Sequence, residues 1–478
     1  MASFDNFING EWVVASQKLN NINPSNTDDV IGEYAQADAA EARLAIAAAS
    51  AAFVNWSRSG IQQRFDCLDA IATEILARKD ELGHLLAREE GKTLPEAIGE
   101  VARAGQIFKF YAGEVLRLNG EFLPSVRAGI DVEVTREPIG VVGIITPWNF
   151  PAAIPAWKIA PALAYGNCVV FKPASLVPGS ASALAEIISR SGLPDGVFNL
   201  VMGSGSIVGN ELLHDDRVRG VTFTGSVQTG AHVAAACSQR GAKYQMEMGG
   251  KNPLIVLNDA DIDIAINCAV NGAYFSTGQR CTASSRLIVE SSIHDKFVSG
   301  LQQALDALQV DDALKEGTHI GPVVDQSQLD QDLKYLRIGK EEGATLLTGG
   351  ERLQRDSEGF YLSPALFVDT NNDMCINREE IFGPVASVIN VADEDEAIAV
   401  ANDTPFGLSA GICTTSLKSA SRFKRDSQAG MVMVNLPTAG VDYHVPFGGT
   451  KASSHGSREQ GRYAAEFYTT VKTAYVLA

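Results

Sequence analysis

The sequence predicts an α/β protein with two open, doubly wound domains and a separate β arm. In residues 141–250, short continuous apolar runs alternate with helical stretches, as is typical of parallel strands covered on both faces. The same alternation recurs in residues 251–440 and predicts a second domain of this type. Two segments, 132–137 and 468–476, alternate polar and apolar residues and therefore predict exposed strands.

The first 116 residues are expected to be β-like at their start and helical afterwards. Residues 1–37 contain short β-like pieces separated by turns, such as the one at 23–26. Beyond them, apolar residues recur at three- and four-residue spacing. We therefore expect helices over 39–52, 62–90 and 94–116, the last with an apolar stripe that faces the core.

The apolar runs also locate the strands of the two sheets. In the first domain we expect strands at 140–145, 168–171 and 221–223. In the second domain we expect strands at 253–257, 287–289, 386–391 and 430–435. Short apolar runs between helical stretches favour buried parallel strands over strands with one solvent-exposed face.

Composition places the chain among ordinary globular proteins. Of its 478 residues, 45 % are hydrophobic and 20 % are charged, which suits two or three domains with a large core. The net charge of −18, from 39 basic and 57 acidic residues, argues against nucleic acid and anionic membrane as partners. The seven cysteines are scattered without Cys-x-x-Cys pairs, and no secretory signal or long apolar span opens the chain. We therefore expect a cytoplasmic protein without disulfides or a metal site.

Cys281 is the residue around which the expected chemistry is organised. It lies in a run of small and polar residues, 272–286, whose backbone lets a ligand come close. Taken alone, a cysteine is more often a small buried hydrophobe than a nucleophile. Glu247 and Asn149 change that balance, because a thiol, a carboxylate base and an amide donor are what acyl transfer through a thioester requires.

Four motifs in a fixed order give the chain a family resemblance. They are 147–151 (PWNFP), 247–253 (EMGGKNP), 278–282 (GQRCT) and 380–384 (EIFGP). With these motifs the chain resembles the non-acylating branch of the aldehyde dehydrogenase superfamily, from about residue 9 to residue 478. It looks most similar to the 2-oxoglutarate semialdehyde (2,5-dioxopentanoate) dehydrogenases, through Arg280, the run 172–175 (KPAS) and the tail 467–472 (FYTTVK).

The resemblance implies an aldehyde dehydrogenase-like fold and a division of labour along the chain. Residues 1–116 and 141–250 would form a dinucleotide-binding domain, and 251–440 a catalytic domain that carries the cysteine. Residues 117–140 and 460–478 would form an oligomerisation arm that pairs across subunits, and 441–459 an anchor and substrate loop. The exposed strands of the arm need a partner edge, so we expect a homodimer or homotetramer.

The cofactor site is expected where a strand meets a glycine turn at Gly225 and Ser226. The helix that follows offers free N–H groups and a positive dipole end to a pyrophosphate, and the resemblance assigns the same residues. The rival turn at 203–206, which contains Gly205, has an incomplete dinucleotide fingerprint and favours a flexible turn. The other cofactor-binding residues that we expect are Ile145, Thr146, Pro147, Trp148, Lys172, Ser175, Gly205, Glu380 and Phe382.

Ser175 bears on which dinucleotide is used. Relatives that are strict for NAD carry a glutamate at this position, which hydrogen-bonds the ribose 2′-hydroxyl and repels a 2′-phosphate. Serine does not repel a phosphate, and Lys172 lies nearby in sequence. We expect use of both NAD and NADP, with NADP favoured, although a merely small Ser175 would leave NAD dominant.

The implied mechanism begins with attack of the Cys281 thiolate on an aldehyde. The Asn149 amide and the Cys281 backbone N–H would stabilise the oxyanion. Hydride then leaves to the nicotinamide, and Glu247 activates the water that hydrolyses the thioester. Acylating relatives lack a carboxylate at the place of Glu247, so the free acid is the expected product. Lys158 and Glu459 are auxiliary candidates.

An anionic substrate needs a local cationic spot on so acidic a protein. Arg103, on the helix expected at 94–116, is predicted to hold a distal carboxylate with help from Arg280. The other expected substrate-binding residues are Gln106, Phe150, Trp157, Thr282 and Phe447. The plainer interpretation is that each arginine is only a solvated charge.

Several functions remain open on these observations. The first is oxidation of 2-oxoglutarate semialdehyde by NAD(P), and the second is the same chemistry on succinate semialdehyde or a neutral aliphatic aldehyde. A cysteine-dependent esterase and a non-catalytic structural protein are the alternatives from other classes. Growth of absorbance by reduced nicotinamide separates the two dehydrogenases from the last two.

Overall fold

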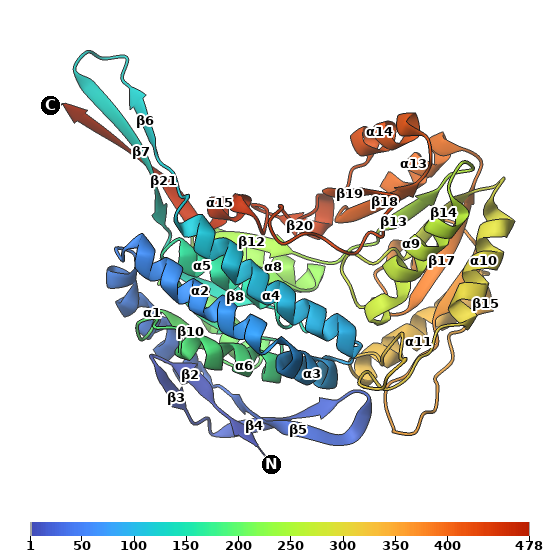
Figure 1. The fold of residues 1–478 in the computed structure, drawn as a ribbon, viewed down its shortest axis with the longest axis horizontal. Helices are drawn as coiled ribbons and strands as arrows, with labels where there is room; N and C mark the ends of the chain where they lie inside the picture. The colour runs from blue at the N-terminus through green and yellow to red at the C-terminus, as the bar shows by residue number, and fades with distance from the viewer. Residues whose placement is uncertain (1, 478) are drawn as a thin grey trace.

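The computed structural model describes residues 2–477, which form two lobes and a projecting β arm (Figure 1). The predicted domain ends at residues 1 and 478 lie outside the described residues. The first lobe is built on an eight-stranded sheet with the order β20-β12-β11-β8-β9-β10-β2-β3. Its strands are β2 (Asn6–Ile8), β3 (Glu11–Val13), β8 (Val141–Ile145), β9 (Cys168–Lys172), β10 (Phe198–Leu200), β11 (Val218–Thr224), β12 (Lys243–Glu247) and β20 (Ser454–His455).

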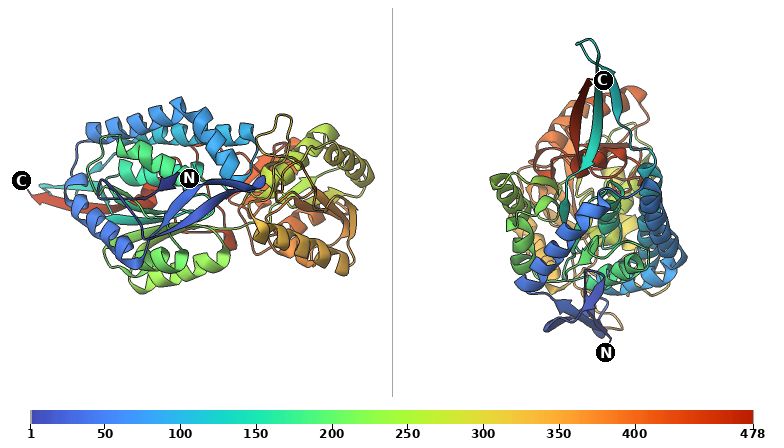
Figure 2. Two further views of the ribbon diagram at one scale, coloured as in Figure 1. Left: turned by 90° about the horizontal axis from the view of Figure 1, so that it is seen from below. Right: turned by 90° about the vertical axis from the view of Figure 1, so that its left-hand side faces the viewer.

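Helices cover both faces of this sheet, as Figure 2 shows. They are α1 (Ala39–Trp56), α2 (Ile61–Ala77), α3 (Lys79–Glu90), α4 (Leu94–Val115), α5 (Ala153–Ala164), α6 (Pro178–Ser189), α7 (Asn210–His214), α8 (Val227–Gln239) and α15 (Ala465–Tyr468). The five central strands, β10 to β12, are mutually parallel, because each crossover passes through a helix. The order reverses at β8, where open α/β sheets place their ligands.

The second lobe holds a seven-stranded sheet with the order β15-β16-β17-β14-β13-β18-β19, in which only the edge strand β15 is antiparallel. Its strands are β13 (Pro253–Val256), β14 (Arg286–Glu290), β15 (Thr345–Thr348), β16 (Ala365–Thr370), β17 (Val385–Val391), β18 (Ser409–Cys413) and β19 (Met431–Val434). Its helices are α9 (Ile262–Tyr274), α10 (His294–Asp306), α11 (Gln326–Glu341), α12 (Cys375–Arg378), α13 (Glu394–Asn402) and α14 (Leu417–Asp426). The predicted class of fold, with two wound α/β sheets, is therefore confirmed.

Two smaller sheets complete the fold. Strands β1 (Ser3–Phe4), β4 (Gln17–Asn23) and β5 (Asn26–Gln36) form a sheet beside the first lobe. The arm consists of β6 (Glu121–Pro124), β7 (Ile130–Pro138) and β21 (Thr469–Leu477), and it projects from the body in Figure 1. Within the arm, β21 pairs with β7 over nine residues, so the two segments satisfy each other inside one chain. The two segments are thus partners of each other, and the edges left without a neighbouring strand among residues 2–477 are the outer ones of β6 and β21.

Three boundaries differ from those predicted. The helix expected over 62–90 is two helices, because the backbone of Arg78 leaves helical geometry (φ −104°, ψ 13°). The arm's second segment begins at Thr469 and not at residue 460, since Phe467 and Tyr468 are buried in the core of the first lobe. The predicted loop 441–459 contains β20, which extends the first sheet beside β12.

The core of the first lobe is one continuous cluster between the sheet and its helices. The second lobe divides its core into three clusters, on the two sides of its sheet and under α11. Among residues 2–477, none of the helices is both long and apolar enough to cross a membrane. The same residues contain no cluster of histidine, cysteine and carboxylate side chains that could hold a metal ion.

Candidate active site

Cys281 lies on the loop between the short helix η2 (Phe275–Gly278) and β14, and its side chain is partly exposed. The loop takes an unusual path, because Ser276 and Thr277 adopt left-handed backbone angles, with φ of 50° and 58°. Gly278 (φ 67°) passes so close to the Gly383 carbonyl oxygen that an added Cβ would lie 2.1 Å from it. A glycine is therefore needed at 278 to seat the loop that carries the cysteine.

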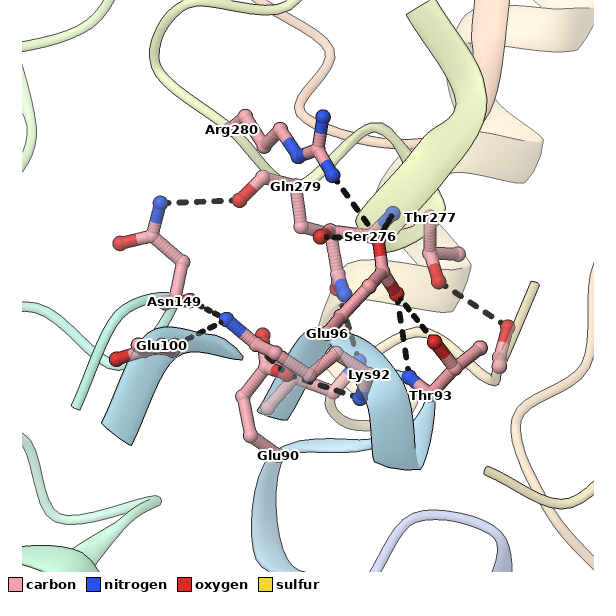
Figure 3. Close-up of polar contacts among 12 residues, drawn as sticks. Glu90, Lys92, Thr93, Glu96, Glu100, Asn149, Ser276, Thr277, Gln279 and Arg280 are labelled. Atoms are coloured by element: carbon pink, nitrogen blue, oxygen red, sulfur yellow. Dashed lines mark hydrogen bonds and ion pairs between the residues drawn. The ribbon is translucent and has the colours of Figure 1, made fainter. Parts of the chain in front are cut away.

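Glu96, at the start of α4, anchors this loop from the opposite lobe. It completes a capping box with Thr93 at the helix N-terminus. Its Oε1 accepts hydrogen bonds from Ser276 N and Oγ, both at 2.9 Å (Figure 3). Arg280 Nη2 lies 2.9 Å from the same oxygen and forms an ion pair with it. One carboxylate thus holds both ends of the segment that precedes Cys281.

Asn149 lies in the turn after β8, and its amide reaches across to the cysteine loop. Asn149 Nδ2 donates to the Gln279 carbonyl oxygen at 2.9 Å, two residues before Cys281 (Figure 3). A primary amide carries two N–H groups, so one remains for a developing oxyanion. The structure therefore places the Asn149 amide beside the nucleophile loop, and its role as an oxyanion donor stays a prediction.

Glu247 ends β12, and its carboxylate is buried. It accepts a hydrogen bond from Ser454 Oγ at 2.6 Å. Burial, and secondly the charge of Glu459, raise the pKa of Glu247 well above the ordinary carboxyl range. Lys158 forms a buried ion pair with Glu459 and also donates to Thr222 Oγ1 at 2.7 Å. The two auxiliary residues therefore form one buried unit whose charge acts on Glu247.

The surroundings of the Cys281 thiol favour its protonated form. Burial, together with the carboxylates Glu380 and Glu247, raises the pKa of Cys281 to about 12. Glu380 accepts a hydrogen bond from Gly250 N at 2.8 Å, and burial raises the pKa of this carboxyl to about 7. Glu380 lies so close to Gly249 that an added Cβ there would be 2.1 Å from Oε2. Glycine at position 249 therefore lets the Glu380 carboxylate approach the backbone closely.

Most of the predicted cofactor residues meet at one edge of the first sheet. Ile145 pairs in register with Lys172 and with Phe223, so the turns after β8, β9 and β11 are adjacent. These turns carry Thr146, Pro147 and Trp148, Ser175, and Gly225 with Ser226. Ser226 is the exposed N-cap of α8, and Ser175 is also exposed.

The chemistry of this edge suits a dinucleotide. At Gly225, an added Cβ would lie 2.5 Å from the Phe223 ring, so a larger residue would have to displace that ring at the turn into the free N–H groups of α8. Thr224 Oγ1 is buried without a hydrogen-bond partner among the described residues. Within residues 2–477, Lys172 Nζ donates only to the neighbouring Pro173 carbonyl oxygen, at 2.7 Å, and burial lowers the pKa of Lys172 to about 8. These polar groups are available to a ribose and its phosphates.

The remaining cofactor candidates fall in two places. Trp148 and Phe382 meet edge to face with ring centres 5.5 Å apart, so they join the turn after β8 to the second lobe. Gly205, which had been expected in a flexible turn, is exposed and begins the helical segment η1 (Gly205–Gly209), which leads into α7. The backbone at Gly205 faces open space, so a ligand can approach it.

A cavity of about 440 Å³ opens onto Cys281 between the two lobes. Of the predicted substrate residues, it is lined by Arg103, Phe150, Trp157, Arg280, Thr282 and Phe447. Trp157 and Phe447 stack with ring centres 5.3 Å apart and form an apolar wall. Gln106 was assigned wrongly, because it lies exposed on α4 and does not line the cavity.

Sequence reasoning missed three charged residues that line the same cavity, Lys92, Glu96 and Glu100. Glu96 and Glu100 are one helical turn apart on α4, so they share a face, and Glu100 is nearly one turn before Arg103. The spacing of Thr93 and Glu96 is a readable helix-start signal. No motif in the sequence marks Lys92, whose partners are the nearby Glu90 and Glu100 and the distant Asn149 main-chain oxygen.

Comparison with known proteins agrees with this geometry. The model of the Aldehyde dehydrogenase family matches residues 12–474. The chain is 45 % identical over 476 residues to an alpha-ketoglutaric semialdehyde dehydrogenase of Bacillus subtilis, covering 98 % of this chain and 97 % of the relative. It is 42 % identical to an alpha-ketoglutarate semialdehyde dehydrogenase of Haloferax volcanii, covering 98 % of each. A crystal structure of betaine aldehyde dehydrogenase from Staphylococcus aureus with NAD+ superposes with a TM-score of 0.97 at 34 % identity, covering 100 % of this chain and 95 % of that one.

The chain therefore belongs to the aldehyde dehydrogenase family. The predicted similarity to 2-oxoglutarate semialdehyde dehydrogenases is confirmed over almost the whole length. It is an NAD(P)-dependent aldehyde dehydrogenase. Neither a cysteine-dependent esterase nor a non-catalytic structural protein therefore describes its primary role.

Proposed function

We propose that this enzyme oxidises 2-oxoglutarate semialdehyde to the free dicarboxylic acid with NAD(P)+. The main observation behind this proposal is that the guanidinium of Arg103 lines the cavity that contains Cys281. An aldehyde whose far end is a carboxylate can then present its carbonyl to the thiol and its anion to the arginine. The names of the relatives from Bacillus subtilis and Haloferax volcanii support the same aldehyde.

Arg103 is better suited to this role than Arg280. Arg280 is already paired with Glu96 at 2.9 Å, so its charge is balanced within the protein. Arg103 has no ion pair with a carboxylate in residues 2–477, and its contacts are a 3.2 Å hydrogen bond from Nη2 to Gln460 Oε1 and the Trp157 ring. Its Nε is buried without an acceptor. A substrate carboxylate would supply the acceptor that this guanidinium lacks.

The catalytic steps use groups that surround Cys281. The thiol gives its proton to a neighbouring carboxylate, for which Glu247 is our assignment, and the sulfur bonds to the aldehyde carbon. The second N–H of Asn149 donates to the resulting oxyanion. Lys172, Gly225 and Ser226 would hold NAD(P)+, which would supply the hydride acceptor for that carbon, and loss of the hydride would convert the adduct on Cys281 to a thioester. Glu247 releases the first proton to solvent and then takes a proton from the water that attacks the thioester, so that the acid is released and the Cys281 sulfur leaves as the thiolate.

For the cofactor we infer use of both dinucleotides, with NADP favoured. Ser175 is small, neutral and exposed beside the edge that carries Lys172, so a 2′-phosphate meets no carboxylate from this residue. The test is kcat/KM measured with each cofactor at a saturating aldehyde concentration. A preference for NAD of roughly a hundredfold or more, about 2.7 kcal/mol, would overturn the proposal.

The substrate is tested by a panel of aldehydes given to the purified protein. We expect kcat/KM for 2-oxoglutarate semialdehyde to exceed that for succinate semialdehyde and for propanal, read from the absorbance of reduced nicotinamide. Propanal serves as the matched control, because it has a similar reactive end and no carboxylate. Equal values for propanal and 2-oxoglutarate semialdehyde would refute the assignment of substrate.

We also propose that the arm assembles a homodimer or homotetramer. Its two outer edges carry unpaired backbone groups, and its surface exposes large apolar side chains such as Phe122 (65 % exposed), Tyr475 (62 %) and Leu477 (75 %). Unpaired edges and exposed apolar side chains together favour burial against another subunit. A second copy of this chain is the expected partner.

A further inference from the structure

Lys92 is a cation that the fold buries almost completely beside the candidate active site. Its side chain is 1 % exposed, and Nζ donates to Glu100 Oε2 and to the Asn149 main-chain oxygen, both at 2.6 Å (Figure 3). The ammonium also lies 4.0 Å from the centre of the Phe150 ring. Since a buried charge is tolerated only with close partners, these contacts fix the position of the ammonium.

Glu100 extends this contact to the beginning of α5. Its Oε1 accepts hydrogen bonds from Ala152 N at 2.8 Å and Ala153 N at 3.1 Å. Lys92 therefore holds the segment 149–153 at its first residue, and Glu100 holds it at its last two. The ion pair between Lys92 and Glu100 joins the two anchors into one clamp.

The clamped segment carries the amide that faces the nucleophile loop. Asn149 Nδ2 donates to the Gln279 carbonyl oxygen, and Glu96 holds the preceding part of that loop through Ser276. Glu96 and Glu100 both belong to α4, so the same helix holds the segment that carries the Asn149 amide and the loop that carries Cys281. A shift of the Asn149 backbone would move the amide relative to Cys281.

We propose that Lys92 is a positioning residue for the oxyanion site, which acts by fixing the main chain of Asn149 while Glu100 fixes the other end of the segment. The proposal rests on the proposed function, because it assumes that the Asn149 amide stabilises the oxyanion. Catalytic donors are sensitive to small displacements, and a misplacement of about 1 Å costs roughly a hundredfold in rate. Lys92 does not itself touch the reacting atoms in this role.

A double-mutant cycle on the full-length enzyme tests the proposal. Asn149→Ala alone is expected to lower kcat roughly a hundredfold to a thousandfold, as loss of an oxyanion donor does. Lys92→Met alone is expected to lower kcat roughly tenfold to a hundredfold, with the dissociation constant of the cofactor unchanged. In the Asn149→Ala background the same Lys92→Met change is expected to cost less than about threefold, because the amide it positions is gone.

Two further variants separate positioning from loss of structure. Lys92→Met/Glu100→Gln removes both charges of the closest pair and leaves Glu90, 3.8 Å from the Lys92 Nζ, as the remaining buried carboxylate, whose pKa burial raises to about 8. The double variant should keep the kcat deficit while regaining part of the thermal stability that Lys92→Met loses. Arg64→Met is the matched control, since Arg64 is also a buried cation that donates to main-chain oxygens, those of Trp56 and Ser57, away from the cavity. It should lower the melting temperature, and any change in kcat should be the same with or without Asn149.

The outcomes are distinguishable. A loss from Lys92→Met that is equally large in both backgrounds would overturn the positioning role and leave the oxyanion assignment of Asn149 standing. A wild-type kcat for Asn149→Ala would overturn the oxyanion assignment and the positioning role together. A wild-type kcat for Lys92→Met would also overturn the positioning role.

Discussion

Replacing Arg103 with alanine removes the one cavity-lining cation that has no carboxylate partner among the described residues. In the proposed complex, its guanidinium binds the distal carboxylate of the substrate, which a neutral aldehyde does not have. The variant should therefore discriminate between substrates, and a general loss of activity would not support the proposal.

The magnitude follows from the contacts of Arg103. A charged hydrogen bond contributes about 1.5–3 kcal/mol, which corresponds to roughly tenfold to a hundredfold in kcat/KM. The upper end of this range is the less favoured one, because Nη2 already donates to Gln460 Oε1 at 3.2 Å. Propanal should lose less than about threefold, since for it the substitution removes only contacts within the protein, those with the Trp157 ring and with Gln460 Oε1.

The assay is steady-state kcat/KM for 2-oxoglutarate semialdehyde and for propanal, with one cofactor at saturation. Lys109→Ala is the matched control, because Lys109 also lies on α4, carries the same charge and pairs with Asp69 outside the cavity at 2.6 Å. This control removes one positive charge from the helix and should leave both substrates within about twofold, as surface ion pairs contribute little. A loss for Arg103→Ala that is equal for both aldehydes, or absent for both, would remove Arg103 from the substrate site.

Other perturbations address the chemistry and the arm. Cys281→Ala should leave less than about 1 % of the dehydrogenase activity, while the cofactor still binds in a fluorescence titration. Higher residual activity would indicate another nucleophile, with Cys268 the next candidate. Glu247→Gln should give one burst of reduced nicotinamide and then stall, whereas full steady-state turnover would exclude it as the base. Glu459→Gln should move the acidic limb of the kcat–pH profile to lower pH, because the charge of Glu459 raises the pKa of Glu247 and Lys158 then remains unbalanced; an unmoved limb, or one at higher pH, would contradict this. Removal of residues 469–478 should give monomers or aggregates by light scattering, and an unchanged oligomer would show that the arm is not the interface.

The parts of the fold that could be predicted are those that depend on local pattern. Continuous apolar runs such as 168–171 became buried strands, since burial on both faces of a sheet requires apolar residues at every position. The expected helix over 62–90 is divided at Arg78. The sequence did not reveal this break, because the apolar spacing continues through Arg78 and neither glycine nor proline stands there. A backbone turn without a special residue leaves no sequence signal.

The chemical residues could be placed together because motif order and sheet topology act jointly. Thr146 and Gly225 are far apart in sequence, yet parallel strands bring their carboxyl ends to one edge. The charge partners could not be predicted in this way, since Glu96 and Arg280 are separated by 184 residues and belong to different lobes. Which two of many charges meet is decided by how the lobes pack, and a single sequence does not encode that as a local pattern.

The ionisable side chains that line the cavity explain how a protein of net charge −18 can receive an anion. Three of them are cations, Lys92, Arg103 and Arg280, and two are carboxylates, Glu96 and Glu100, so the lining carries 3 − 2 = +1. Glu100 balances Lys92 and Glu96 balances Arg280. The remaining positive charge is that of Arg103, and the thiol of Cys281 adds no negative charge while it is protonated. A monoanionic aldehyde therefore neutralises the cavity on entry, whereas an uncharged aldehyde leaves the Arg103 guanidinium desolvated and without a counter-ion, and this difference favours the carboxylated substrate.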